Sequence, residues 1–171
     1  MFHAGTEPAA LQQYLNHDLG FDQVRWATLS RTSYDSRQSF QGKPQKTLLP
    51  AGTRLFRLLR LAVGTYFEAV WWIPEQVFRE LHDSAQRAEH GGGRLFRNYV
   101  AESLALPGSN TQLCAVEIEL KKPVYAWVGR SAALFGRPGG VNQVFLPNLA
   151  DRGAPLSSTN ARVVRTYWLR F

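Results

Sequence analysis

A glycine-rich segment followed at once by a polar side chain is the part of the chain best suited to chemistry. Residues 136–143 are Gly-Arg-Pro-Gly-Gly-Val-Asn-Gln. Glycines permit turns with positive φ and let backbone amides approach a ligand closely. Gln143 begins the apolar run Gln-Val-Phe-Leu, so we expect a strand that presents an amide to whatever the loop covers. A plain hairpin turn would produce the same pattern.

Two earlier segments could bind an anion and a flat ring. Arg57 lies within the apolar segment 53–61, where a charged side chain needs a partner, and a guanidinium matches a phosphate or a carboxylate. Segment 64–72, Gly-Thr-Tyr-Phe-Glu-Ala-Val-Trp-Trp, offers aromatic faces. The simpler interpretations are an arginine on an edge strand and a hydrophobic core. Trp71 and Trp72 are neighbours that point to opposite faces of a strand, so at least one should be core.

Together these segments resemble the ADP-ribosyltransferase superfamily, including NAD+ glycohydrolase toxins of the tuberculosis necrotizing type. The resemblance covers residues 50–147 and includes, besides the arginine strand and the aromatic segment, three further stretches. These are Ala-Leu-Pro-Gly-Ser-Asn at 105–110, Gly-Arg-Ser-Ala at 129–132 and Phe-Gly-Arg-Pro-Gly-Gly-Val-Asn-Gln at 135–143. The last is the most specific. The resemblance implies an α+β fold with a split β-sheet core and with N-terminal and mid-chain helices.

The same resemblance implies a toxin-like enzyme that takes NAD+ as its substrate and cleaves the nicotinamide–ribose bond. Gln143 would be catalytic, as an acceptor beside the nicotinamide ribose. Cleavage would pass through an oxocarbenium-like state, which such a group stabilises. Arg57 would clamp the pyrophosphate or hold the strand of the site, while Tyr66 and Phe67 would flank the nicotinamide. The expected NAD+ contacts are Arg57, Thr65, Tyr66, Phe67, Trp72, Phe135, Gly139 and Gly140.

One departure concerns the acceptor of the ADP-ribose. Many members of the superfamily carry Glu-x-Glu or Gln-x-Glu where this chain has Gln143-Val144-Phe145, so the carboxylate that activates an acceptor is missing. Its absence favours hydrolysis by water, whereas the net charge favours transfer to an acidic protein or to RNA. Glu117-Ile118-Glu119 does spell Glu-x-Glu, but it precedes the loop, and we expect the polar face of a strand there. Glu68 is a better candidate for the missing carboxylate, because it lies within the aromatic segment.

The charge and length of the chain limit the partners and the domain count. The 171 residues suit one domain, and 20 basic against 13 acidic residues give a net charge of +7. The basic residues are scattered, as on an ordinary solvated surface. If the protein is a toxin, the resemblance implies a dedicated immunity protein, and a basic toxin would be matched by an acidic one.

Two other functions remain open. One is a catalytically silent fold that binds a partner or nucleic acid, and the weaker one is an RNA-binding domain that uses basic and aromatic residues. The enzyme interpretation requires Arg57 and Gln143 to converge on one cleft, and it fails if they lie on opposite sides.

Other functional classes find little support. Cys114 lies in an apolar run and should be a core residue, and the four histidines lack ligand spacing, so we expect no metal. No stretch approaches the roughly 18 apolar residues of a membrane span, and the N-terminus lacks the pattern of a signal peptide. We therefore expect a cytoplasmic protein, or one delivered into the cytoplasm of a target cell by another route.

Periodicity predicts an order of elements that positions these residues. We expect a helix over 8–19, a polar segment over 22–47 with at most a short strand, and strands over 53–61 and 65–73. Helices should follow from Pro74 and over 95–104, and then strands over 113–120, 123–128, 143–146 and 161–171. This order is α+β rather than alternating. Residues 1–49 would be an appendage to an NAD+-binding core of residues 50–171.

Overall fold

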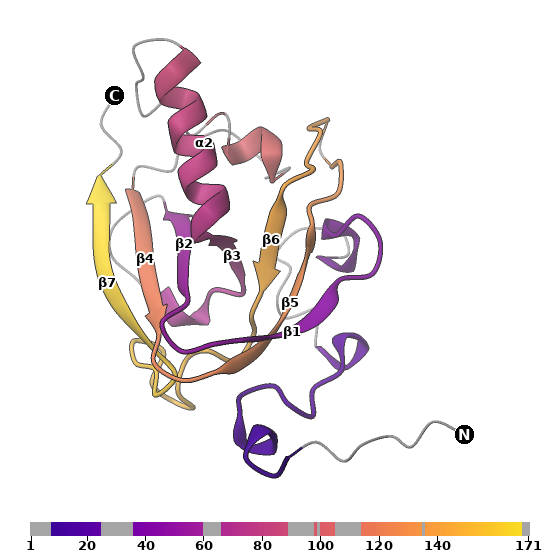
Figure 1. Ribbon diagram of the computed structural model, residues 1–171, viewed down its shortest axis with the longest axis vertical. Helices are drawn as coiled ribbons and strands as arrows, with labels where there is room; N and C mark the ends of the chain where they lie inside the picture. Colours follow the sequence, from indigo (N-terminus) through magenta and orange to yellow (C-terminus); the bar gives the residue numbers. More distant parts are fainter. Residues whose placement is uncertain are drawn as a thin grey trace.

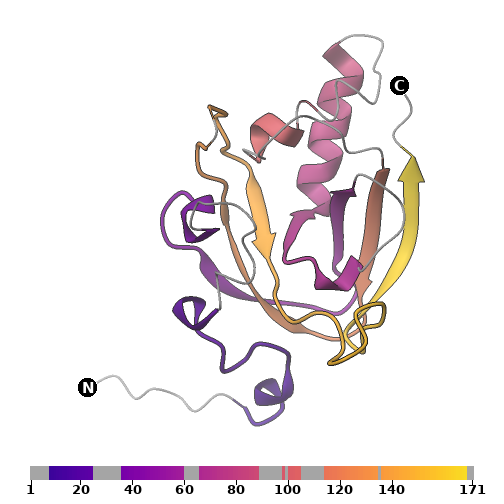
Figure 2. The same cartoon turned by 180° about the vertical axis from the view of Figure 1, so that it is seen from behind.

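A single curled antiparallel sheet organises the chain. The computed structural model describes residues 8–24, 36–59, 66–88, 98, 100–104, 114–134 and 136–168. The sheet has seven strands in the order β1-β5-β6-β3-β2-β4-β7, and helix α2 (Glu75–Ala88) packs against β2 and β3 (Figures 1 and 2). Three strands precede α2 and four follow it, rather than helices alternating with strands, which is compatible with an α+β fold.

Most of the predicted strands are present with small shifts of their ends. They are β2 (Arg54–Leu59), β4 (Cys114–Leu120), β5 (Val124–Arg130), β6 (Asn142–Phe145) and β7 (Ala161–Trp168). The expected strand over 65–73 is instead a 3-10 turn, η4 (Tyr66–Glu68), followed by β3 (Trp71–Pro74). Pro74 ends β3 rather than opening the helix, and α2 begins at Glu75. Of the helix expected over 95–104, the structure describes residue 98 and residues 100–103 as helical.

The helix predicted over residues 8–19 is wrong. The chain forms a 3-10 turn, η1 (Leu11–Gln13), and Leu15 then makes a parallel bridge to Val124 on β5. Asn16 adopts a positive φ of 64° and donates its side-chain amide to two backbone carbonyls at 3.1 and 2.9 Å, so the segment is tied to the sheet. These tertiary contacts outweigh a weak local helix propensity.

Strand β1 (Gln45–Leu49) lies in the segment for which at most a short strand was expected. It pairs with β5 from Gln45 opposite Val128 to Leu49 opposite Val124. An edge strand keeps one side in water, so its polar sequence is compatible with pairing. The sheet therefore begins within the residues assigned to the appendage, while the division at residues 49 and 50 stays a prediction.

The two faces of the sheet carry separate cores. One face, which we call the Trp72 face, buries the cluster that includes Leu55, Trp72, Val116 and Val144. The other, the Phe145 face, is covered by α2 over one part and by the N-terminal segment over the rest, and it carries two clusters. The N-terminal part of the Phe145 face is built from Val24, Phe40, Val70, Trp127 and Phe145, with Leu19, Phe21 and Trp71 packed against them.

Candidate functional site

Gln143, the predicted catalytic residue, is fixed in one orientation. Its side chain, on β6, is only 6% exposed, and its Nε2 donates a hydrogen bond of 2.7 Å to the backbone carbonyl of Ser39. A carbonyl oxygen can only accept, so the amide nitrogen must face Ser39 and Oε1 must face the other way. Oε1 has no hydrogen-bond donor among the residues that the structure describes. The result is a buried acceptor oxygen held in place.

The group that holds Gln143 comes from the segment before β1. The Ser39 carbonyl also accepts a 2.9 Å bond from the backbone N–H of Ala132, and the N–H of Gln41 donates to the Arg130 carbonyl at 2.8 Å. Phe40 lies between these two bonds and bridges to Ser131. Phe40 therefore forms a single antiparallel bridge beside the end of β5, directly after the 3-10 turn η3 (Ser36–Ser39).

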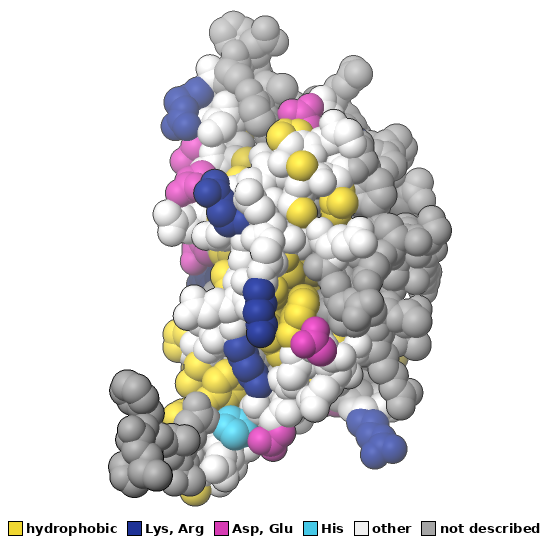
Figure 3. Space-filling view, turned by 90° about the vertical axis from the view of Figure 1, so that its right-hand side faces the viewer, with side chains coloured by type: hydrophobic (Ala, Val, Ile, Leu, Met, Phe, Trp, Pro, Cys, Tyr) yellow, Lys and Arg dark blue, Asp and Glu magenta, His cyan; other side chains and the backbone are white. Residues whose placement is uncertain are grey.

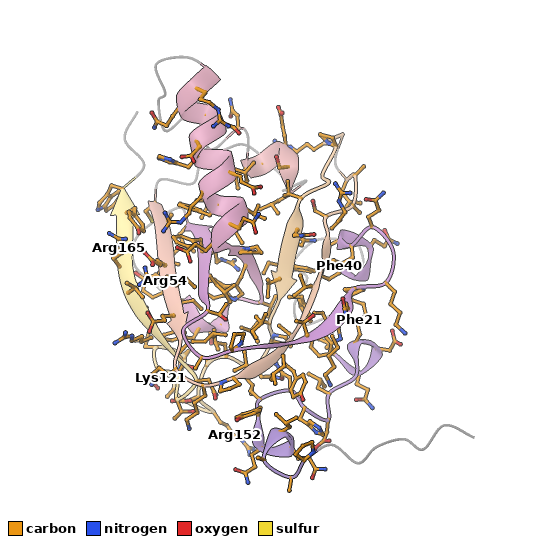
Figure 4. All side chains as sticks on the ribbon, in the orientation of Figure 1. Phe21, Phe40, Arg54, Lys121, Arg152 and Arg165 are labelled. Carbon is orange, nitrogen blue, oxygen red and sulfur yellow. The ribbon has the colours of Figure 1, made fainter. Side chains whose placement is uncertain are left out.

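Phe40 packs on a position where only glycine fits. A Cβ added at Gly129 on β5 would lie 2.8 Å from Cδ1 of Phe40, well inside contact distance. The Phe40 ring is 5% exposed, and its centroid lies 5.3 Å from that of Trp71 and 6.0 Å from that of Phe21. Figure 4 marks Phe21 and Phe40 on the same side of the molecule, where the N-terminal segment meets β1 and β5.

The glycine-rich loop uses its amides within the protein. Gly139 has a φ of +64°, and a Cβ there would lie 2.3 Å from the Ala132 carbonyl oxygen. Its N–H donates to the Glu102 carbonyl at 2.9 Å, and the N–H of Gly140 donates to the Ser131 carbonyl at 2.9 Å. Close packing of the backbone thus explains the glycines. That Gly139 and Gly140 contact NAD+ stays a prediction.

Arg57 forms a hydrogen bond between β2 and β3 beyond the residues that pair in the sheet. β2 and β3 pair only through Leu55 and Phe56. The Val70 carbonyl accepts from Leu146, so the next carbonyl along the chain, that of Trp71, points toward β2 instead. Arg57 Nη1 donates to the Trp71 carbonyl at 3.3 Å. No carboxylate within the described ranges pairs with this half-buried guanidinium, and desolvation by burial lowers the pKa of Arg57.

The face that carries Gln143 follows from the strand register. Residues opposite one another in an antiparallel ladder point to the same face, and alternate residues of one strand do so too. Phe56 on β2 is opposite Ile73 on β3, and Trp71, two residues before Ile73, is opposite Phe145 on β6. Gln143 is two residues before Phe145. Gln143 therefore shares the Phe145 face with Phe56.

Arg57 follows Phe56 directly, so it belongs to the Trp72 face. Its partner in the register with β4 is Val116, which is completely buried in the cluster of that face. The structure thus does not bring together Arg57 and Gln143, the pair on which the enzyme interpretation was made to depend.

The aromatic residues predicted to line the site lie with Arg57. Phe67 is 5% and Trp72 is 1% exposed in the Trp72-face core, and Tyr66 packs against the same cluster. The indole of Trp72 donates to the Ala69 carbonyl at 3.2 Å. Trp72 is thus a core residue, as expected for at least one of the two tryptophans. Thr65 and Phe135 lie outside the described residues.

A buried carboxylate was missed by the sequence analysis. Glu117, expected on the polar face of a strand, is 1% exposed and accepts hydrogen bonds from Arg54 (2.8 Å), Arg165 (2.9 Å) and the Tyr167 hydroxyl. Arg54 and Arg165 come from β2 and β7, the neighbours of β4 on either side (Figure 4). The arginines are 63 and 48 residues away in the sequence, so only strand pairing reveals the cluster.

The pKa values of this cluster follow from its contacts. Burial would raise the pKa of Glu117, but the hydrogen bonds from Tyr167 and Arg165 and the charges of Arg165 and Arg54 outweigh it. They hold the pKa of Glu117 below its ordinary value. Burial and the bond to the carboxylate raise the pKa of Tyr167 to about 12. The cluster binds β7 to the rest of the sheet rather than forming an open site, because its carboxylate is enclosed.

One face of the molecule shows how charged and hydrophobic side chains are distributed over the described residues. On the side drawn in Figure 3, two of the coloured Lys and Arg side chains lie next to each other beside a hydrophobic patch, and the others lie apart. Among the described residues, no three His, Cys, Asp or Glu side chains are grouped so that they could hold a metal ion. Within the same ranges, no helix has the length and apolar character needed to cross a membrane.

Comparison with known proteins identifies the fold. No protein-family model and no curated protein matches the chain. Among solved structures, Tne2 in complex with Tni2 is similar, with 16% identity over 77% of this chain and 98% of that one and a TM-score of 0.50. The chain has the fold of Tne2. Rhs1-CT, solved with its cognate immunity protein RhsI1, is 18% identical over 74% of this chain and 82% of its own, with a TM-score of 0.49.

Proposed function

We propose that this chain is a toxin-like enzyme that binds NAD+ and cleaves its nicotinamide–ribose bond. The ADP-ribose would pass to water or to a macromolecular acceptor, protein or RNA. The observation that carries the proposal is Gln143, a buried amide whose nitrogen is engaged by Ser39 and whose Oε1 has no donor among the described residues. It lies on the strand that follows the glycine-rich loop, where the resemblance to ADP-ribosyltransferases places the catalytic residue.

An oriented amide oxygen suits the chemistry of this bond. Cleavage builds positive charge on the nicotinamide ribose, and an acceptor that bonds a ribose hydroxyl stabilises that charge. The acceptor costs no reorganisation when it is already fixed, and removal of one such group typically lowers the rate about 10²–10³-fold. An amide does not take up a proton, so Gln143 would not activate the acceptor. Water is therefore the favoured acceptor.

The partner proposed for this enzyme is an acidic immunity protein. Tne2, whose fold this chain shares, was solved in complex with Tni2. The net charge of +7 would attract an acidic protein and speed its association.

The position of Arg57 favours a second candidate, a catalytically silent fold that binds a partner. Arg57 lies on the Trp72 face with Tyr66, Phe67 and Trp72, whereas Gln143 lies on the Phe145 face. If Arg57 is the arginine that NAD+ requires, this arrangement does not assemble a catalytic site. The condition that Arg57 and Gln143 converge on one cleft is therefore not met, which counts against the enzyme in the form expected from the sequence, and the proposal that we retain rests on Gln143 alone.

NAD+ consumption by the purified protein separates the two candidates. We expect free nicotinamide and ADP-ribose, with the rate lowered about 10²–10³-fold in a Gln143→Ala variant. Asn142→Ala is the matched control, since Asn142 is the exposed neighbour on the same strand. Nicotinamide release only after addition of cell extract would identify a transferase. No turnover in either condition would refute the enzyme and leave the binding module.

A further inference from the structure

The segment before β1 contacts the proposed catalytic residue through a hydrogen bond. Gln143 reaches across to Ser39, which lies 104 positions earlier in the chain. The Ser39 carbonyl cannot move freely, because the N–H of Ala132 bonds to it at 2.9 Å and the neighbouring Gln41 is bonded to Arg130. The nitrogen of the Gln143 amide is thus directed toward a backbone group on a separate segment.

One hydrogen bond is a weak restraint on a long side chain, because glutamine gives up much rotamer freedom when it is fixed. Burial must therefore supply most of the constraint. Phe40, next to Ser39, is 5% exposed and lies against Gly129, which is opposite Gln143 in the register of β5 and β6. Because Gly129 has no side chain, the Phe40 ring can pack against its backbone next to Gln143.

We infer that Ser39 and Phe40 form the positioning element of this site: the Ser39 carbonyl orients the Gln143 amide, and Phe40, seated on Gly129, holds that carbonyl in place. This inference rests on the proposed function for its effect on catalysis, but the orientation of Gln143 can be measured without it. It also gives residues 39–41 a role in the site, although the sequence analysis assigned them to an appendage.

Two variants disturb the element in different ways. Phe40→Leu removes the ring that fills the space over Gly129, and Gly129→Ala adds a methyl group 2.8 Å from the ring. Phe78→Leu is the matched control, because Phe78 on α2 stacks on Phe56 with ring centroids 4.1 Å apart, on the other part of the Phe145 face. If one of the two variants fails to fold, the other still tests the inference.

The first measurement is the side-chain amide signal of Gln143 in ¹⁵N-labelled protein, identified by its absence from the spectrum of Gln143→Ala. We expect a signal shifted from that of free glutamine and slow to exchange with water. It should move toward the free position in Phe40→Leu and in Gly129→Ala, and it should stay unchanged in Phe78→Leu. A signal that is insensitive to both variants would overturn the inference.

The second measurement is steady-state NAD+ cleavage. Misplacement of a catalytic group by about 1 Å can cost about 10²-fold, so we expect both variants to lower kcat by roughly 10–100-fold with KM little changed. The control should keep kcat. Equal losses in Phe40→Leu and Phe78→Leu would show general destabilisation and contradict positioning. If the parent protein cleaves no NAD+, the proposed function fails, and the amide signal alone decides whether the element orients Gln143.

Discussion

Gln143 and Arg57 point to opposite faces of the sheet, from strands that lie on either side of β3. The separation follows from the alternation of side chains along each strand. The register places Phe56 and Gln143 on the same face, and Arg57, the residue after Phe56, points to the opposite face. Arg57 is held toward β3 by its bond to the Trp71 carbonyl, on the face away from Gln143. The two residues are therefore tested separately.

Arg57 should bind an anion without being needed for stability. Arg57→Met keeps the length of the side chain, removes a charge that lacks a described carboxylate partner, and gives up one hydrogen bond of about 0.5–1.5 kcal/mol. We expect the free energy of unfolding to change by no more than about 1 kcal/mol. Inorganic pyrophosphate should raise the melting temperature of the parent protein but not of the variant. An equal rise in both would show that Arg57 only holds the strand. Arg60→Met, at a position outside the described residues, serves as the comparison within the same segment.

Removal of the Glu117 charge should be costly. Glu117→Gln removes the carboxylate that Arg54 and Arg165 share, and because these arginines are 37% and 59% exposed and can be solvated, we expect a cost of about 1.5–3 kcal/mol, typical of a lost hydrogen bond to a charged group. Urea unfolding measures this cost. Glu119→Gln is the control on the same strand, because Glu119 is 21% exposed against 1% for Glu117 and its partner Arg162 is 64% exposed, and a solvent-accessible pair typically contributes no more than about 1 kcal/mol. Similar losses in the two variants would contradict a buried cluster that binds β7.

Tyr167 should make stability fall at alkaline pH. Its folded pKa of about 12 lies above its ordinary value of 10.0, so the unfolded phenol ionises first as the pH rises. In that interval the unfolded state holds fewer protons than the folded state, and stability is lost progressively from pH 10 to 12. Tyr167→Phe should reduce stability at neutral pH by about 1.5–3 kcal/mol and should flatten this alkaline slope. Urea unfolding at several alkaline pH values checks both effects, and an unchanged slope would contradict the assignment to Tyr167.

Gly139 and Gly136 should respond differently to the same substitution. Both have positive φ, +64° and +71°, so alanine is strained by about 1–2 kcal/mol at either position. At Gly136 the new Cβ meets no described atom within 4 Å, whereas at Gly139 it would lie 2.3 Å from the Ala132 carbonyl oxygen. Gly139→Ala should therefore cost about 1–3 kcal/mol more than Gly136→Ala in the free energy of unfolding. Equal costs would mean that the loop is free to move away from Ala132.

Local patterns predicted the strands well and the N-terminal region poorly. The segments of β2, β4 and β7 contain hydrophobic residues in a strand-like pattern, so their sequences alone predicted strands there. Residues 8–19 have a weak helical period, and their structure depends on contacts such as that of Leu15 with Val124, which lies 109 residues away. Edge strand β1 was only partly anticipated because its exposed side is polar, and polar composition is typical of loops too.

The site shows the same division between local and distant information. The loop pattern was enough to mark Gln143 as a polar residue at the start of a strand, and its place on β6 agrees with that prediction. Nothing near Gln143 in the sequence indicates that Ser39 would fix its amide, or that Glu117 would lie between arginines of two other strands. These side chains meet their partners only because the tertiary structure brings segments that are distant in the sequence next to each other.

The residue types alone indicated a chain of strands with few helices and a net charge of +7, an arginine within an apolar strand and an amide beside a glycine-rich loop. These features depend on composition and on periodicity over a few residues. Which face each side chain occupies was settled by the folded chain, because the register of β3 against β2 and β6 determines it, and a shift of one residue would reverse it. For that reason the separation of Arg57 from Gln143, and the Ser39 carbonyl that orients Gln143, became visible only in the assembled sheet.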